Sequence, residues 1–235
     1  MGPHPGGAAM TDGPAHSAGR ARILGRVRRA LADVPRYERP EDHPVPRDYL
    51  RAHGERTPAE SVDLLAARLT DYRAVVHRTD PPGLPALLAE LLRRRGAHRV
   101  VVPVGLPDGW LAEAAVEQVV DTAELTARAL DAVDSVVTGC ALAIAETGTL
   151  VLDAGPDQGR RRITLVPDHH LCVVRAPGQV VDSVPRALER LSPVRPLTWI
   201  SGPSATSDIE LDRVEGVHGP RTLEVVLVES PEPPS

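Results

Sequence analysis

The stretch LPALLAELLRRRGAHRVVVPV (84–104) decides the fold, because it joins a helix to a buried strand through a single stop signal. Residues 84–95 carry apolar side chains at helical spacing, and Gly96 ends the helix because glycine readily adopts the left-handed backbone. The run HRVVVPV is apolar on both faces, which is typical of a strand covered on both sides. A helix that leads at once into a buried strand predicts an α/β protein with a parallel sheet.

The same alternation continues on both sides of this stretch. Thr57-Pro58-Ala59-Glu60 is a capping box with proline at the first helical position, and it predicts a helix reaching about Thr70. A short strand over 73–77 follows. Further helices are expected over 109–116 and 123–131, and further strands over 134–139, 141–153, 170–176, 196–202 and 223–229. We therefore predict a mostly parallel sheet flanked by helices, with a mixed sheet or an added β layer in the strand-dense second half.

The N-terminal quarter of the chain differs in composition from the rest. Residues 1–17 are rich in Gly, Pro, His and Ala, which predicts a disordered tail. Residues 18–57 read as a helical arm and a proline-rich strap, with the helix over 18–32 capped by Ser17. Such an arm commonly forms a dimer contact, so we expect it to serve a homo-oligomer if one exists. The main domain is expected over 58–230.

Bulk composition excludes several classes of protein. The chain has 27 basic and 32 acidic residues, a net charge of −5 and no basic face, so no nucleic-acid partner is expected. Two cysteines, Cys140 and Cys172, are too few for a disulfide scaffold or for an iron–sulfur cluster, which takes about four thiolates. No apolar run approaches the roughly 20 residues of a membrane span, and the N-terminus lacks an apolar signal region. A cytoplasmic protein with buried, unreactive thiols is expected.

One carboxylate stands out inside the apolar run ALAIAETGTLVLD (141–153). If the run is one extended strand, Glu146 lies in a row with Leu142, Ile144, Leu150 and Leu152. A carboxylate in such a row needs hydrogen-bond donors or a break in the strand, which Thr147, Gly148 and Thr149 offer. Two interpretations remain open: Glu146 is a general base, nucleophile or substrate clamp, or it is a structural carboxylate tied to a turn.

The segment SGPSATSD (201–208) is too polar and rich in hydroxyl groups to be a core element. Its spacing at Ser207-Asp208-Ile209-Glu210 fits a capping box, so a helical turn is expected near Asp208. Free N–H groups at such a turn favour anions. The residues that would line this anion site are Ser201, Gly202, Ser204, Thr206, Ser207 and Asp208. The alternative is a well-capped turn that binds nothing.

Three histidines invite a functional interpretation. His218 lies between Gly216 and Gly219, where it could bind an anion or move a proton, or could lock the 201–210 loop. His169 and His170 are adjacent on an expected strand, so they point to opposite sides and do not readily chelate one ion. No metal-binding motif or phosphate-binding loop is present, and no metal site is predicted, although Asp168, Glu146 and one of these histidines could meet.

Four motifs together resemble the LUD-domain family, and within it the lactate utilization protein C group. They are AIAETGTLVLD, PDHHLCVV (167–174), SGPSATSDIE and GVHGP (216–220), whose order and spacing match over about residues 58–228. The resemblance implies a fold related to the superfamily of CoA-transferases, ribose-phosphate isomerases and formyltetrahydrofolate cyclo-ligases. It also implies oxidation of L-lactate to pyruvate, with two partner subunits that carry the iron–sulfur clusters and no cofactor in this chain.

The resemblance assigns no catalytic residues, so their roles are inferred from chemistry. A lactate site needs an anion clamp and a base for the hydroxyl proton. The 201–208 loop with Gly219 would supply the clamp and Glu146 or His218 the base. One of Arg160–Arg162, with Arg162 as the chosen candidate, would be a bidentate partner for the carboxylate. Two other functions stay open. The chain could be a CoA- or acyl-handling enzyme in which Glu146 attacks a thioester, or a non-catalytic assembly subunit.

Overall fold

The computed structural model describes residues 14–33, 46, 48–206, 214–215 and 219–230. The chain divides into two units, Met1–Tyr49 and Leu50–Ser235. The first unit contains helix α1 (Pro14–Ala30), on which Ile23 and Val27 are exposed. The helix begins four residues earlier than the sequence predicts, which fits the preference of proline for the first helical turn. The rest of the expected tail and most of the strap lie outside the described residues.

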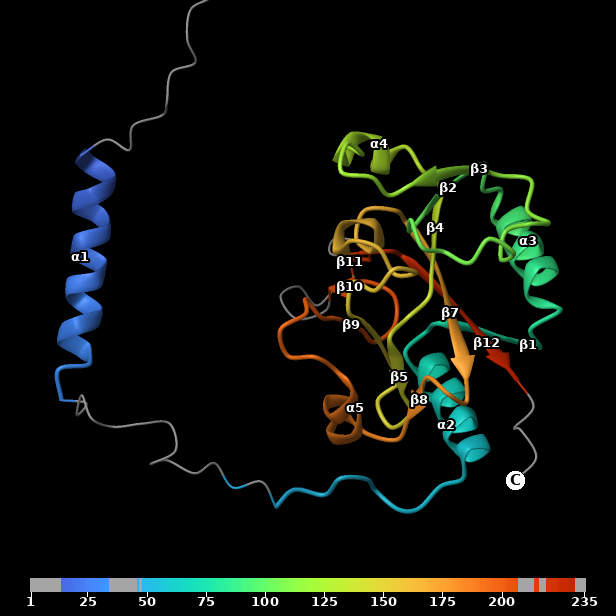
Figure 1. Cartoon of the computed structure of the whole chain (residues 1–235), viewed down its shortest axis with the longest axis horizontal. Coiled ribbons are helices and arrows are strands. Elements are labelled where there is room, and N and C mark those ends of the chain that lie inside the picture. The colour runs from blue at the N-terminus through green and yellow to red at the C-terminus, as the bar shows by residue number, and fades with distance from the viewer. Residues whose placement is uncertain (1–13, 34–45, 47, 207–213, 216–218, 231–235) are drawn as a thin grey trace, which may run out of the picture. The chain divides into compact units, whose positions relative to one another are not determined.

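The second unit is built around a six-stranded sheet with the order β1-β12-β7-β4-β2-β3 (Figure 1). All its neighbouring strands are parallel. The strands are β1 (Val75–Thr79), β2 (Arg99–Val102), β3 (Glu117–Val120), β4 (Ser135–Thr138), β7 (His169–Ala176) and β12 (Thr222–Glu229). Helices α2 (Pro58–Asp71), α3 (Leu84–Arg95), α4 (Ala127–Asp131) and α5 (Val184–Arg190) accompany them. The expected α/β fold with a mostly parallel sheet flanked by helices is confirmed.

A second sheet forms the added β layer that the strand-dense half of the sequence predicts. Its order is β8-β5-β6-β9, from β5 (Leu142–Ile144), β6 (Thr149–Leu152), β8 (Val180–Val181) and β9 (Thr198–Ile200). The β5–β6 and β6–β9 pairs are antiparallel, whereas β5 and β8 are parallel. A short antiparallel pair, β10 (Ala205–Thr206) and β11 (Val214–Glu215), follows β9.

Two local predictions are wrong. Residues 141–153 are a hairpin, so the chain reverses at the turn 145–148 and the expected single row of side chains splits. Leu142 and Ile144 join one apolar cluster, whereas Leu150 and Leu152 join another. The predicted helix over 109–116 is a series of turns, in which Trp110 and Leu111 are buried. Eight residues with glycine at the start make too few hydrogen bonds to hold a helix on their own.

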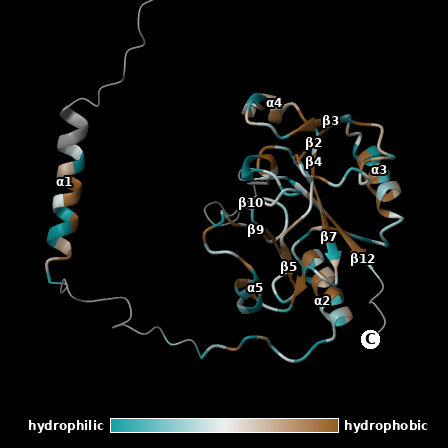
Figure 2. Ribbon diagram, in the orientation of Figure 1, coloured by the Kyte–Doolittle hydropathy of each residue, from teal (hydrophilic) through white to brown (hydrophobic). Residues whose placement is uncertain are grey.

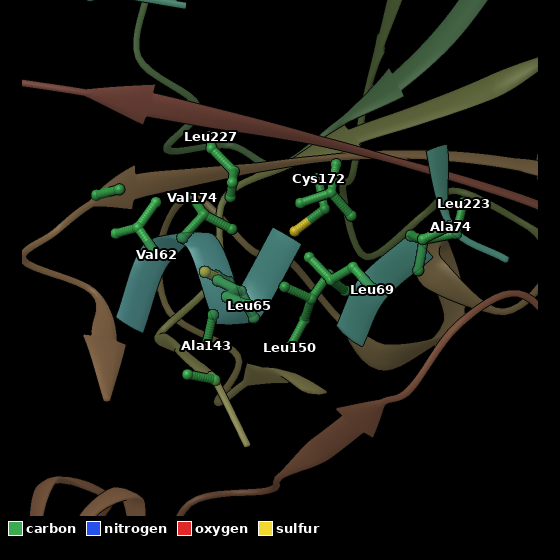
Figure 3. Close-up of a cluster of buried hydrophobic side chains, with 14 of the residues drawn as sticks. Val62, Leu65, Leu69, Ala74, Ala143, Leu150, Cys172, Val174, Leu223 and Leu227 are labelled. Carbon is green, nitrogen blue, oxygen red and sulfur yellow. The ribbon is translucent and has the colours of Figure 1, made fainter. Parts of the chain in front are cut away.

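The core lies in layers on both faces of the six-stranded sheet. One cluster joins α2 to the sheet and to the second sheet, with Leu65, Leu69, Leu150 and Cys172 at its centre (Figure 3). A second cluster packs α3 against the opposite face. The central strands are correspondingly brown in Figure 2, whereas α1 and α5 carry much teal. The far face of the second sheet packs on α5.

The two main helices begin and end where the sequence places their signals. Thr57 accepts a hydrogen bond from the Glu60 backbone N–H, and the Glu60 carboxylate accepts one from the Thr57 N–H. Gly96 ends α3 with φ 69°, in the left-handed region. No helix within the described ranges is long and apolar enough to cross a bilayer. Because α2 leads into β1 and α3 leads into β2, the ends of these helices position the starts of both strands. Helix α2 also packs against the second sheet.

Candidate functional site

Glu146 lies in the β5–β6 turn and is held by the segment that precedes α2. Its carboxylate accepts hydrogen bonds from the His53 backbone N–H at 2.9 Å and from Arg56 Nη1 at 3.1 Å, and it lies 3.0 Å from His53 Nδ1. Burial alone would raise its pKa, but these hydrogen bonds outweigh burial and hold the pKa of Glu146 below its usual value. The side chain therefore stays ionised and ties the hairpin turn to residues 53–56.

A chain of hydroxyl groups leads from this turn to β9. Thr147 Oγ1 lies 2.7 Å from Thr149 Oγ1, which lies 2.8 Å from Ser201 Oγ. Thr149 is buried, whereas Ser201 is exposed at the end of β9. The structure thus joins three predicted binding residues, Thr147, Thr149 and Ser201, in one row of hydrogen bonds. The buried Thr149 hydroxyl holds the Ser201 side chain in place.

Next to Ser201 lies a cavity of about 210 Å³, which we call the β9 cavity. It is formed by β9 and the loop after it, by the turn before β12, by the start of β7 and by the short 3₁₀ helix η2 (Arg161–Thr164). Its polar lining residues are Arg161, Thr164, His170, Thr198, Ser201 and Ser204, and its other lining residues are Leu165, Trp199, Ile200, Gly202, Pro203, Gly219, Pro220 and Leu223. Four of the predicted binding residues, Ser201, Gly202, Ser204 and Gly219, therefore share one cavity.

Two of the predicted glycines allow close packing against the end of α2. Gly202 has φ 84°, and a Cβ there would lie 2.4 Å from the Tyr72 carbonyl oxygen. Gly148 has φ 57°, and a Cβ there would lie 2.8 Å from the Arg68 carbonyl carbon. Both positions combine left-handed backbone with a close approach, so no other residue fits. The loop that contains Gly202 and the turn that contains Glu146 therefore both pack against the C-terminal end of α2.

The two adjacent histidines of β7 make separate contacts. His169 Nδ1 lies 2.8 Å from Ser135 Oγ, and its Nε2 lies 3.2 Å from Glu224, a carboxylate that also contacts His77 at 2.7 Å. His170 Nε2 lies 2.8 Å from Thr138 Oγ1. Both rings are fully buried, and they lie on opposite faces of the strand as predicted. Among the described residues, no group of three or more His, Cys, Asp or Glu is placed to hold a metal ion.

The arginine triplet 160–162 divides between two places. Arg160 binds the buried Asp121 carboxylate through Nε at 3.0 and 3.1 Å, and Arg162 Nη2 donates to the Thr122 carbonyl at 3.2 Å. Arg161 lies between them in sequence and lines the β9 cavity. The structure therefore places the predicted carboxylate partner Arg162 beside Asp121 and Thr122, and its neighbour Arg161 at the cavity.

A second hollow of about 410 Å³, the α5 hollow, lies at the other end of β7. It is lined by Arg56, Pro58 and Ser61, by the loop after Ala176 and by α5. Each of its charged side chains has a hydrogen-bond partner. Arg56 contacts Glu146, Arg186 contacts Glu189 at 3.4 Å, and Arg190 donates to the Gly178 carbonyl at 3.0 Å. Ser61 Oγ donates to Asp182 at 2.5 Å.

Both cysteines are buried and free, as predicted. Cys172 lies on β7 two residues after His170, and Cys140 follows β4. A hydrogen bond with Cys172, together with full burial, raises the pKa of the Cys140 thiol well above its usual value. A neutral, shielded thiol is a poor nucleophile, so Cys140 has a structural role.

Several predicted positions lie outside the described residues. They are His218, Ser207 and Asp208, together with the capping box and helical turn expected near 207–210. The backbone of Thr206 is described, in β10. Conversely, Thr164, Thr198 and Trp199 line the cavity but were absent from the prediction, Arg161 was named only as one of the triplet 160–162, and His170 was weighed only as a metal ligand. Thr198 and Trp199 directly precede the hydroxyl-rich loop in sequence, whereas Arg161, Thr164 and His170 adjoin it only in space.

Comparison with known proteins identifies the relatives of this fold. The LUD domain family model matches residues 66–228. A lactate utilization protein C from Deinococcus radiodurans is 42% identical over 226 residues, which are 93% of this chain and 100% of that protein. The chain belongs to the LUD-domain family.

Two further comparisons extend this result. A lactate utilization protein C from Bacillus licheniformis is 29% identical over 94% of this chain and 99% of that protein. The crystal structure of a DUF162 family protein from Deinococcus radiodurans matches with a TM-score of 0.65 and 40% identity, covering 74% of this chain and 99% of that one. The LUD-domain fold described above is therefore shared with an experimental structure.

Proposed function

We propose that this LUD-domain protein acts in lactate utilization, as a subunit of a system that oxidises L-lactate to pyruvate. The observation that carries this proposal is the relative named lactate utilization protein C, which is 42% identical to this chain along its whole length. Identity at this level over a whole protein supports a common role. The proposal includes a small carboxylate substrate and two partner subunits that carry iron–sulfur clusters.

The geometry supports a small substrate better than a CoA derivative. The β9 cavity, at about 210 Å³, is smaller than the roughly 300–1,000 Å³ pockets that hold drug-sized ligands, and CoA is larger than those. Glu146, the nucleophile that a CoA-transferase reaction would need, is held by His53 and Arg56 and does not line this cavity. We therefore rank acyl transfer below lactate utilization. Proton transfer by Glu146 or His218 stays a prediction.

The proposal is tested by lactate-dependent dye reduction in a mixture of this protein and the two iron–sulfur subunits. We expect omission of any one of the three proteins to abolish reduction of the dye. Unchanged reduction without this chain would contradict the proposal.

A variant comparison separates a substrate-handling role from an assembly role. We expect Arg161→Gln to lower dye reduction while the iron–sulfur subunits are still captured in a pull-down. Equal activity of Arg161→Gln, Glu146→Gln, His218→Ala and the wild type, with equal capture of partners, would instead assign this chain to assembly. Trapping of a Glu146 thioester with hydroxylamine after addition of an acyl-CoA would favour acyl transfer.

A further inference from the structure

The walls of the β9 cavity have an unusual balance of charge. Among the lining residues that the structure describes, Arg161 is the cationic side chain and none is Asp or Glu. The guanidinium of Arg161 takes part in none of the ion pairs found within the described part of the chain, in contrast to Arg160 and Arg162. A positive group with no nearby carboxylate attracts an anion, and a guanidinium is suited to a carboxylate because two N–H groups can bind its two oxygens.

The position of Arg161 is fixed by its own short helix. Arg161 opens η2, and Thr164 Oγ1 donates a hydrogen bond to the Arg161 carbonyl oxygen at 3.0 Å. Elsewhere in the lining, Ser201 is held through Thr149, and the Ser204 backbone N–H donates to the Pro220 carbonyl at 2.8 Å. The cationic wall and the hydroxyl-bearing wall are thus built on separate supports, which keeps the space between them open.

His170 supplies a buried polar group to the same cavity. Its ring is fully buried, and its Nε2 is occupied by Thr138 Oγ1 at 2.8 Å. Its Nδ1 has no hydrogen-bond partner among the described residues, although buried ring nitrogens are normally satisfied. A ligand with a hydroxyl or carbonyl oxygen could satisfy this nitrogen, because imidazole Nδ1 either accepts or donates according to its tautomer.

We propose that the β9 cavity binds a small carboxylate that carries an oxygen atom on C2, with the carboxylate on Arg161 and the C2 oxygen on His170 Nδ1. This inference rests on the proposed function and names the ligand class and the residues that select it. Trp199, Ile200 and Leu223 provide an apolar wall for a short carbon chain. The cavity volume of about 210 Å³ lies below the roughly 300–1,000 Å³ of pockets for drug-sized ligands, which suits an acid of three or four carbons.

Calorimetric titration of the purified full chain with three acids tests the selection directly. L-lactate has a C2 hydroxyl, pyruvate has a C2 carbonyl, and propionate has neither. We expect L-lactate and pyruvate to bind on the order of tenfold more tightly than propionate, because only they satisfy the buried nitrogen. Equal affinity for L-lactate and propionate in the wild type would overturn the role of His170 without requiring any variant.

Two substitutions at His170 separate its two nitrogens. His170→Gln retains an amide near the Nε2 position, so it keeps the Thr138 contact and loses the nitrogen offered to the ligand. We expect it to bind L-lactate as weakly as propionate, with propionate affinity unchanged. His170→Asn places an amide near the Nδ1 position and should retain preference for L-lactate. The opposite order of the two variants would overturn the assignment of Nδ1.

Arg161→Gln tests the carboxylate contact, and Arg95→Gln at the exposed end of α3 is its control for loss of one charge. We expect Arg161→Gln to weaken all three acids on the order of tenfold, because a bidentate ion pair is lost, whereas Arg95→Gln binds normally. Unchanged binding by Arg161→Gln would overturn the carboxylate assignment. Thermal melts establish that each variant folds.

Failure of this inference is distinguishable from failure of the proposed function. If none of the three acids binds, but omission of the chain still abolishes lactate-dependent dye reduction, the cavity assignment is wrong and the role in lactate utilization stands. If the acids bind as expected, but omission changes nothing, the cavity assignment stands and the lactate role is wrong.

Discussion

The two hollows at the ends of β7 differ in how their charges are satisfied. The α5 hollow lies beyond the carboxyl end of the strand, where parallel sheets usually bind ligands, and its three arginines contact acids or backbone. The β9 cavity lies at the amino ends of β7 and β12, next to the second sheet, and within the described ranges no carboxylate lines this cavity beside Arg161. The proposed site in the β9 cavity therefore follows from its unpaired polar groups and not from strand direction.

The added sheet explains why the rule about strand ends misleads. The loop after Ser201 follows the carboxyl end of β9, but β9 belongs to the four-stranded sheet. The residues at the end of β9 share the lining of the β9 cavity with the starts of β7 and β12. A rule derived for one open parallel sheet does not apply across two sheets.

The largest expected effect concerns the glycines of the two hollows. Gly202 lines the β9 cavity with φ 84° and would place a Cβ 2.4 Å from a backbone oxygen, whereas at Gly178 of the α5 hollow the nearest atom is 4.0 Å away. We expect Gly202→Ala to lower the free energy of unfolding by about 2–4 kcal/mol, from backbone strain and overlap. Gly178→Ala should change it by less than about 1 kcal/mol. Urea unfolding measures both, and similar values would contradict the difference in packing.

Glu146 gives the next largest effect, and it depends on pH. We expect Glu146→Gln to lower the free energy of unfolding by about 1–3 kcal/mol at neutral pH, because charged hydrogen bonds to His53 and Arg56 are lost. A carboxylate whose pKa is lowered in the folded state stabilises fully above its unfolded pKa, near 4.5, and this stabilisation disappears as the pH falls through the folded pKa. Urea unfolding from pH 3 to 7 should show the difference between the two proteins closing below about pH 4.5. A constant difference would mean that the carboxylate charge is irrelevant.

A smaller effect is expected at the rim of the α5 hollow. Glu189 contacts Arg51 and Arg186, but its side chain is 43% exposed, whereas that of Glu146 is 15% exposed. Exposed ion pairs contribute about 0–1 kcal/mol, so Glu189→Gln should lower the free energy of unfolding by less than about 1 kcal/mol. A loss as large as that of Glu146→Gln would show that the two hollows hold their carboxylates equally firmly.

The smallest expected effect is on ligand binding. Arg186 already contacts Glu189, so Arg186→Gln in the α5 hollow should change L-lactate affinity by less than about twofold. Calorimetric titration beside Arg161→Gln provides the contrast. A loss at Arg186 that matches the loss at Arg161 would move the binding site to the carboxyl end of β7.

Local signals in the sequence predict the framework well. The Thr57 capping box, the stop at Gly96 and the apolar strands give α2, α3, β2, β7 and β12 close to their observed bounds. These signals act within a few residues, so they can be read without the rest of the chain. The short elements β3, β8 and α5 were not predicted, because two to seven residues carry little periodic signal.

The candidate site was predicted only in part, because its members meet through tertiary structure. The hydroxyl-rich loop and the Thr-Gly-Thr turn were found by composition, and the contact between Thr149 and Ser201 joins them. The placement of Arg161 instead of Arg162 at the cavity depends on the handedness of η2, and the pairing of Glu146 with His53 bridges 93 residues. Neither is encoded in a local pattern.

The two buried thiols also provide a way to measure how often the core opens locally. Cys140 and Cys172 are the two thiols of the chain, and both are shut inside the layer between α2 and the sheets. An aromatic disulfide reagent can modify them only when that layer parts, so its rate of reaction measures how often the layer opens. If the reagent reacts with these thiols more slowly when an acid is bound, then ligand binding in the β9 cavity reduces the opening of the layer between α2 and the sheets.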